Sequence, residues 1–252
     1  MSIPIIINSE DGVQGSSGSD FTVRFEAPIK LNSLGWKVGV VRLQTWYSTH
    51  NISSDTGNHV FTYSVDSGSS WKTITIPDGN YSAQELNDFI QKEMRDAGDY
   101  DSVNDEYYIT LEPNFSTNKI KIFISNATYR VDLSASNNPS TLLGFTEKVV
   151  TSTETGSTIA DFSGGINSWL LHCDLTSASF LNGKSSDTLL TFTPNVPSQA
   201  SLDVEPRNIT FAQVNKEIIS SIRIRLTDEN DVTLDLNGEE TVVHLVLLPL
   251  GQ

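Results

Sequence analysis

Apolar and polar residues alternate in many short segments of this chain, which is the pattern of half-buried β-strands. In "FTVRFEAPI", every second side chain from Phe21 to Ile29 is apolar, and Thr, Arg and Glu stand between them. "GWKVGVVRLQTWYS" continues as a long strand whose apolar phase shifts between Val40 and Val41, which predicts an irregularity near Gly39. Because helical patterns are scarce, we predict a mainly β protein.

One segment has a clear helical pattern. In "YSAQELNDFIQKEM", Ser82 and Glu85 have the spacing of a capping box, and Tyr81 and Leu86 that of a hydrophobic staple. The predicted buried stripe consists of Leu86, Phe89, Ile90 and Met94. A second, shorter helical turn, "STLLGF", is closed by Gly144.

The strand-like segments fall into a middle group and two flanks. The first 55 residues contain about three strands and the last 88 or so about five, and eight strands are the number in a two-sheet jelly roll. We therefore predict a jelly-roll β-sandwich from residues 1–55 and 165–252. Residues 56–164 are predicted to form an inserted mixed α/β module, of the order hairpin, helix, hairpin. It ends in the polar stretch "VTSTETGSTIADFSGG", which we interpret as a linker or exposed loop.

Near the end of the chain, two apolar runs flank four carboxylates between Asp228 and Asp235, which are followed by Asn237-Gly238. A helix-loop-helix calcium site with Gly238 at its sixth position would put Thr233 at the first position and His244 at the twelfth, where Asp and Glu are needed. The flanks are also strands. We therefore favour two turns, one formed by the first carboxylates and one by Asn237-Gly238. An irregular calcium site between Asp228 and Asp235 remains an open alternative.

No other motif points to catalysis or to a cofactor. His172 and Cys173 are neighbours on a predicted strand, so they point to opposite faces, and a lone cysteine in an apolar run is usually a core residue. The four histidines lack metal-ligand spacing, and the Gly-Ser pairs lack the lysine of a phosphate loop. We expect no enzyme, no catalytic, cofactor-binding or metal-binding residue, and no cofactor. An active site assembled from residues distant in the sequence would leave no local motif of this kind.

Composition and charge limit which classes of partner the chain can bind and where in the cell it is made. The 252 residues include 31 acidic and 16 basic ones, a net charge of −15, which disfavours direct contact with nucleic acid. The single cysteine excludes an intramolecular disulfide, and "MSIPIIINSEDG" lacks the basic region of a secretion signal. No segment has the length of a membrane span. We expect synthesis inside the host cell, in the cytosol or nucleus, without a signal peptide.

Two further features leave alternatives open. Trp36, Trp46, Tyr47 and Trp71 lie near predicted strand ends, where core packing explains most of them and a carbohydrate or protein contact is the alternative. The final run "TVVHLVLLPL" is apolar on both faces, so it is either sandwiched inside the domain or covered by another subunit.

Several segments together resemble one family. "SIRIRLTDENDVTLDLNGEETVVHLVL" is similar to the C-terminal end of the penton-type minor capsid proteins of Polinton (Maverick) elements, adintoviruses and virophages. "INSWLLHCDLTSASFLNGKSSDTLLTFTPNVP" resembles the preceding part of that family, and "SWKTITIPDGNYSAQELNDFI" and "STLLGF" resemble its middle module. These structural motifs touch most of the chain.

The resemblance implies a structural protein of the virion, a single-jelly-roll penton subunit. Such subunits form homopentamers at the capsid vertices and contact a double-jelly-roll major capsid protein. The family is not enzymatic, so no catalytic residues carry over. Two other hypotheses stay open. One is a jelly-roll carbohydrate- or receptor-binding module of a virus or mobile element, and the other is a host-encoded copy of a capsid gene.

Overall fold

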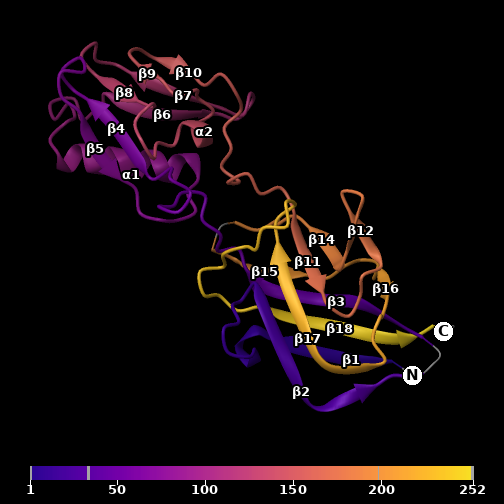
Figure 1. Cartoon of the computed structure of the whole chain (residues 1–252). Helices are drawn as coiled ribbons and strands as arrows, with labels where there is room; N and C mark the ends of the chain where they lie inside the picture. The colour runs from indigo at the N-terminus through magenta and orange to yellow at the C-terminus, as the bar shows by residue number, and fades with distance from the viewer. Residues whose placement is uncertain (1, 33–34, 198, 251–252) are drawn as a thin grey trace. The chain divides into compact units, whose positions relative to one another are not determined.

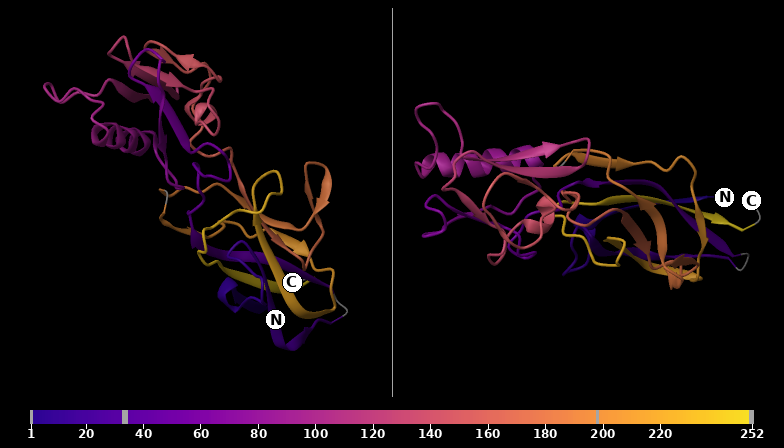
Figure 2. Two further views of the ribbon diagram at one scale, coloured as in Figure 1. Left: turned by 60° about the vertical axis from the view of Figure 1, so that its left-hand side comes forward. Right: turned by 90° about the horizontal axis from the view of Figure 1, so that it is seen from above.

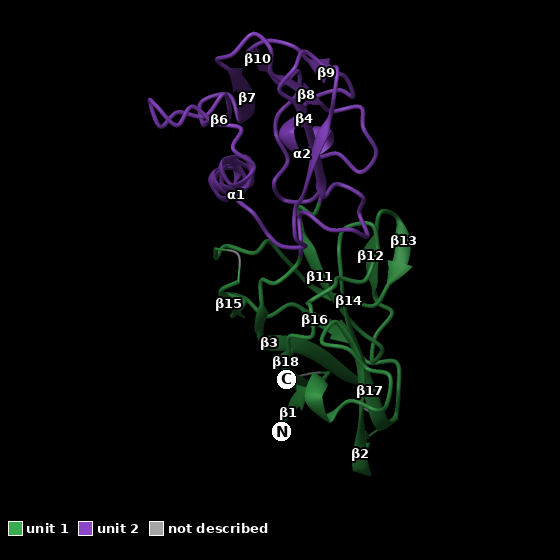
Figure 3. Ribbon diagram, turned by 90° about the vertical axis from the view of Figure 1, so that its left-hand side faces the viewer, with its two compact units in different colours: residues 1–49, 166–252 green, residues 50–165 purple. Residues whose placement is uncertain are grey.

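The chain divides into two compact units (Figures 1 and 3). The computed structural model describes residues 2–32, 35–197 and 199–250. Unit 1 comprises residues 1–49 and 166–252, and unit 2 comprises residues 50–165. Unit 2 therefore interrupts the sequence of unit 1.

Unit 1 is built from β-strands and one short 3-10 helix, η1 (Ser9–Asp11). Its strands before the interruption are β1 (Ile3–Asn8), β2 (Asp20–Lys30) and β3 (Trp36–Trp46). Its strands after the interruption are β11 (Trp169–Cys173), β12 (Ser179–Leu181), β13 (Lys184–Ser186), β14 (Thr188–Phe192), β15 (Ser201–Val204), β16 (Phe211–Gln213), β17 (Ile218–Thr227) and β18 (Val242–Pro249).

Most of these strands form two antiparallel sheets with jelly-roll order. Sheet A has the order β1-β18-β3-β15, with β16 also paired to β3, and sheet B has the order β14-β11-β17-β2. If β15 and β16 are taken as one interrupted strand, the orders in chain sequence are 1-8-3-6 and 2-7-4-5. This is the arrangement of a jelly roll, so the predicted fold class is confirmed.

The first and last strands lie side by side in sheet A (Figure 2), where Ile3 pairs with Leu247 and Asn8 with Val242. Side chains from the inner faces of both sheets form one core, which includes Val38, Trp169 and Leu245. Both ends of the chain are therefore needed to complete the sandwich.

The long strand β3 contains the irregularity that the sequence predicts. The register of β3 with β18 shifts so that His244 faces Arg42 while Leu245 faces Val40, which leaves Val41 as the extra residue of a bulge. Gly39 lies beside it, and a Cβ at Gly39 would come within 2.4 Å of Ile209 Cγ2. Glycine is thus required there because another segment passes close to the strand.

The alternation predicted for β2 holds at Phe21, Val23, Phe25 and Ile29, which belong to the core or pack against it, and it is wrong at Ala27. Ile29 pairs with Ile219, but the next register pair is Arg24 with Ser221, so the residues between bulge away from β17. Ala27 is exposed as a result. Pro28 lacks the N–H that a continuous ladder needs, which explains the break.

Unit 2 contains two small antiparallel sheets and two helices. The four-stranded sheet has the order β5-β4-β8-β9, and the three-stranded sheet has the order β10-β7-β6. The strands are β4 (Val60–Ser64), β5 (Lys72–Thr75), β6 (Ile109–Asn114), β7 (Lys119–Ile124), β8 (Arg130–Asp132), β9 (Val149–Val150) and β10 (Glu154–Thr155). The helices are α1 (Ala83–Asp96) and α2 (Ser140–Leu143).

The predicted helix signals are present at α1 and α2. Ser82 caps α1 and forms the reciprocal capping box with Glu85, and Gly144 closes α2 in the left-handed conformation with φ 76°. The predicted stripe on α1 is buried except at Phe89, which is half-buried. Asn87 is also buried, because its Oδ1 accepts a hydrogen bond from Leu111 N of β6 at 2.8 Å.

Residues 50–55 lie in unit 2, although the strand pattern of the sequence places them with the jelly roll. Ile52 is fully buried in the core of unit 2 and forms a β-bridge with Gly79. The Asn51 side chain both donates to Tyr81 O and accepts from Tyr81 N. These partners lie about 30 residues away, so no local pattern reveals them.

The polar stretch predicted as a linker or exposed loop is mostly exposed coil, and hydrogen bonds hold it to unit 2. Its residues Glu154 and Thr155 pair with β7 as strand β10. Further along, Gly156 N donates to Ile120 O and Ala160 N donates to Asn118 O. Its polar composition reflects an exposed sheet edge, and exposed edges favour polar residues.

Candidate functional site

The acidic segment that raised the question of a calcium site turns the chain. Asn237 and Gly238 both have positive φ, 52° and 81°, and Glu239 N donates to Leu236 O, which closes a two-residue turn. At the first carboxylates, Asp231 N donates to Asp228 O. The prediction of two turns is confirmed.

The carboxylates in the first turn bind protein groups. Asp228 Oδ1 accepts from Asn230 N and Val232 N, both at 2.8 Å. Glu229 accepts hydrogen bonds from the Asn167 side chain and from the backbone N–H of Asn167 and Ser168. These bonds, above all the one from the Asn167 side chain, lower the pKa of Glu229 to about 2. Glu229 therefore fastens the turn to the start of β11.

His172 occupies a buried polar cluster on the outer side of sheet B. Its Nδ1 lies 2.7 Å from Asp187 Oδ1, and its Nε2 lies 2.9 Å from Thr227 Oγ1. Asp, His and a hydroxyl in this order also occur in nucleophilic active sites. Thr227 is fully buried, however, so its hydroxyl cannot reach a substrate. The cluster joins β11, the β13–β14 connection and β17.

Cys173 points into the opposite side of sheet B and is part of the core. Burial raises the pKa of its thiol to about 12, so the thiolate needed for nucleophilic attack does not form near neutral pH. The prediction that Cys173 is a core residue is confirmed.

Within residues 2–32, 35–197 and 199–250, no three His, Cys, Asp or Glu side chains are grouped so that they could hold a metal ion. The same residues contain no helix that is both long enough and apolar enough to cross a bilayer. The described part of the chain thus presents neither a metal centre nor a membrane-spanning helix.

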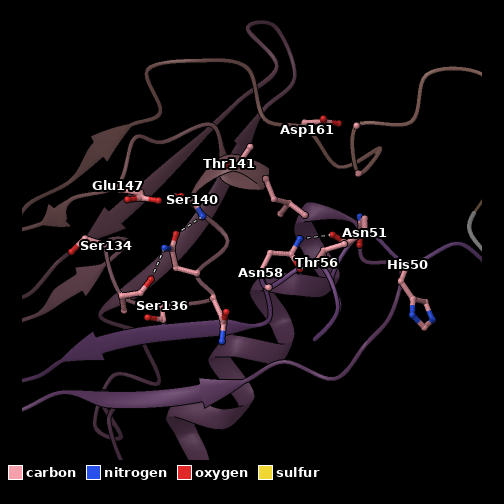
Figure 4. Close-up of a pocket in the computed structure, with 17 residues that line it drawn as sticks. His50, Asn51, Thr56, Asn58, Ser134, Ser136, Ser140, Thr141, Glu147 and Asp161 are labelled. Atoms are coloured by element: carbon pink, nitrogen blue, oxygen red, sulfur yellow. Dashed lines mark hydrogen bonds between the residues drawn. The ribbon is translucent and has the colours of Figure 1, made fainter. Parts of the chain in front are cut away.

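A polar depression of about 630 Å³ lies in unit 2 (Figure 4). Many of its polar groups already bind other groups of unit 2. Asn58 Oδ1 accepts from Ser53 N, and Asn58 Nδ2 donates to Asn51 O. Asn138 likewise donates to Ala135 O. Among the described residues, no Trp, Tyr or Phe lines this depression, so it lacks the stacking surface typical of carbohydrate sites.

The four aromatic residues near predicted strand ends divide into two pairs. Trp36 is buried, and Tyr47 packs against the core with its ring centroid 5.8 Å from that of Trp169. Trp46 and Trp71 are exposed to 43% and 39%, and they lie in different units. The exposed pair therefore does not form a shared site within either unit.

The last strand, β18, is sandwiched on one side only. Val243, Leu245 and Leu247 enter the core, whereas Val246 and Leu248 on the other side are half-buried. Neighbouring strands and the segment before β16 add apolar side chains to this outer side of sheet A. We call the set the apolar face, and it consists of Pro4, Ile6, Ile209, Phe211, Val246 and Leu248. Ile6 is its most exposed large member, at 67%.

A second exposed feature of unit 1 is the hairpin formed by β12 and β13, which was not predicted. We call residues 177–186 the hairpin arm. Asn182 and Gly183, with φ 49° and 80°, form its tip, and Phe180 is 77% exposed. Asn-Gly between two short strand-like runs is a strong hairpin signal, so the sequence does indicate this turn.

Comparison with known proteins supports the fold assignment. No family model and no curated protein sequence matches the chain. Among solved structures, the chain is similar to the crystal structure of the selenomethionine-labelled mavirus penton protein, with a TM-score of 0.50 and 9% sequence identity. The match covers 98% of this chain and 99% of that chain, so it extends over both units.

An identity of 9% shows a shared fold and no more. The resemblance to penton proteins that the sequence suggests is therefore confirmed at the level of fold, along nearly the whole length of the chain. The chain folds as a jelly roll interrupted by a second unit, and the mavirus penton protein is a solved structure with a similar fold.

Proposed function

We propose that this chain is a structural capsid protein, the single-jelly-roll penton subunit of a virus-like element. In this proposal five copies form a ring at each capsid vertex, and the ring contacts a double-jelly-roll major capsid protein. The observation that supports it most is the similarity to the mavirus penton protein over both units.

The chemistry of the described residues agrees with this proposal. In the Asp187–His172–Thr227 cluster the Thr227 hydroxyl is fully buried, and Cys173 is buried in the core. The net charge of −15 disfavours contact with the genome. We therefore expect protein partners, no catalytic activity, and location in the virion shell.

A ring of five needs a heterologous interface, in which two different surfaces of each copy meet. We expect the surfaces to come from strand edges and loops of the jelly roll, including the C-terminal strand β18. Residues 50–165 would then remain available for outward or neighbouring contacts.

The direct test is the mass and shape of the purified full chain. Gel filtration with light scattering should give about five times 27.7 kDa, and negative-stain images should show five-fold rings. Co-expression with a double-jelly-roll major capsid protein should place the chain in particles. A stable monomer that never enters particles would contradict the proposal.

A further inference from the structure

Two of the exposed apolar surfaces of unit 1 are relevant to self-association. One is the hairpin arm, residues 177–186, whose Phe180 is 77% exposed. The other is the apolar face of sheet A, where Ile6 is 67% exposed. The arm follows β11 of sheet B, whereas the apolar face belongs to sheet A, so the two surfaces lie on different parts of the sandwich.

Hydrogen bonds within the hairpin arm hold its two strands together near the base. Ser179 Oγ donates to Ser186 O, and Ser185 Oγ donates to Ser177 O. Next to the arm, Asp187 accepts from Cys173 N through its carbonyl and contacts His172 through its carboxylate. Phe180 pairs across the arm with Ser185, which is too small to cover its ring. The arm therefore presents Phe180 in a preformed position, which reduces the entropy lost on docking.

Charge identifies where two copies can approach each other. Because each copy carries a charge of −15, identical chains repel one another except where carboxylates are absent. The hairpin arm contains Lys184 and no acidic residue. The six residues of the apolar face are uncharged, and the Lys37 amine lies 4.9 Å from the ring centroid of Phe211. At the rim of that face, Arg42 is paired with both Asp203 and Glu205, so two carboxylates share one cation, and the Glu205 side chain is 69% exposed. Lys184 of an approaching arm would complement Glu205.

We propose that the hairpin arm of one copy docks on the apolar face of a second copy, with Phe180 as the anchor. The contact joins two different surfaces, so it repeats from copy to copy and can close a ring. Buried aromatic anchors commonly dominate such interfaces. This inference rests on the proposed function, since it names the surfaces that would form the ring.

The first experiment compares three variants of the full chain by sedimentation velocity over a concentration series. Phe180→Ser removes the anchor, and Ile6→Lys places a cation on the apolar face opposite the cationic arm. Each should raise the concentration for half-assembly about 30-fold or more. The matched control is Phe115→Ser, because Phe115 is 87% exposed at the β6–β7 turn of unit 2. It should assemble like the unaltered chain.

A mixing experiment tests the pairing itself. The Phe180→Ser chain keeps an intact apolar face, and the Ile6→Lys chain keeps an intact arm. A mixture of the two should therefore form a complex of one copy of each that cannot extend, at concentrations where either variant alone is monomeric. At a concentration where the unaltered chain is itself dissociated, circular dichroism melts of both variants should match those of the unaltered chain, since both side chains are largely exposed.

The outcomes separate this inference from the proposed function. If the unaltered chain forms no ring, the proposed function fails. If it forms a ring that Phe180→Ser leaves intact, or that Phe115→Ser disrupts equally, the ring stands and the docking contact is overturned. The absence of a mixed complex would also overturn the pairing of arm and face. So would a Phe180→Ser chain that assembles normally, even if it fails to enter particles.

Discussion

The two units differ in how far apart in the sequence their contacting strands lie. In sheet A of unit 1, β18 pairs with both β1 and β3, so residues at opposite ends of the chain form one ladder. In unit 2, β4 pairs with β5 and β6 pairs with β7, both through short connections, and α1 carries its own capping box. Unit 2 also has longer pairings, such as β4 with β8, where Thr62 faces Asp132, but its hairpins and its helix cap are local. It is therefore more locally determined than unit 1.

This difference predicts separate folding behaviour. Closing a long loop costs conformational entropy before distant strands gain contacts, so unit 1 should fold more slowly than unit 2. A local unit inserted in the chain can fold first and bring residues 49 and 166 toward each other. Destabilising one unit at a time, by truncation or substitution, therefore tests whether the two units fold independently.

The largest effect should come from removing β18 by ending the chain after Thr241. This change deprives β1 and β3 of their shared partner and removes three core side chains, Val243, Leu245 and Leu247. Unit 1 should lose its cooperative unfolding transition completely, as measured by scanning calorimetry. Amide hydrogen exchange should still show protected residues in unit 2.

The control for that truncation is residues 50–165 expressed alone. Their thermal midpoint should stay within a few degrees of the unit 2 transition of the full chain, because their core is internal. If the truncated chain lost all protection, unit 2 would depend on unit 1 and the comparison would be wrong.

A matched pair of core substitutions should separate the units by a smaller amount. Leu245→Ala in unit 1 and Leu86→Ala in unit 2 each remove a side chain that is at most 1% exposed. Each should lower the free energy of unfolding of its own unit by about 3 kcal/mol through the cavity left behind. Denaturant titration followed by hydrogen exchange assigns each loss to a unit, and equal losses in both units from either change would contradict the comparison.

The same contrast explains what the sequence could predict. The caps of α1 and α2, the bulge at Val41 and the turn at Asn237-Gly238 follow from residues within a few positions of each other, and all four are confirmed. The jelly-roll assignment needed only the number and position of the strands, since the eight-stranded closure is a common solution for an all-β chain.

The features that the sequence pattern does not predict mostly depend on contacts between residues far apart in the chain. Ile52 belongs to unit 2 because it bridges to Gly79, which no local pattern indicates. The short strand β15 depends on its pairing with β3 across the whole inserted unit. The clamp between Glu229 and Asn167 spans 62 residues. The hairpin arm is different, because Asn182-Gly183 is a local turn signal.

The capping box of α1 gives a smaller test of local determination. Ser82→Ala removes the Oγ that accepts from Glu85 N, so unit 2 should lose about 1 kcal/mol while unit 1 is unchanged. Ser82→Asp restores an acceptor at this position and is the control. Urea unfolding monitored in each unit by hydrogen exchange measures the difference. A loss equal to that of Leu86→Ala would mean that the serine supports more than the helix end.

The smallest expected effect is the change that Glu229→Gln makes to the acid unfolding of unit 1. Hydrogen bonds from Asn167 and Ser168 lower the pKa of Glu229 in the folded state from 4.5 to about 2, so its carboxylate stabilises unit 1 above pH 4.5, and this contribution disappears as the pH falls from about 4.5 to about 2. Glu229 lies near the surface, so solvent screening keeps the contribution under about 1 kcal/mol. Glu229→Gln should therefore flatten the acid slope of unit 1 stability.

In unit 2, hydrogen bonds chiefly from Ser70 lower the pKa of Asp66 to about 2 as well, so the acid slope of that unit should persist in the same variant. Calorimetric scans from pH 6 to pH 2 that showed both slopes flattened would mean that the two units unfold together.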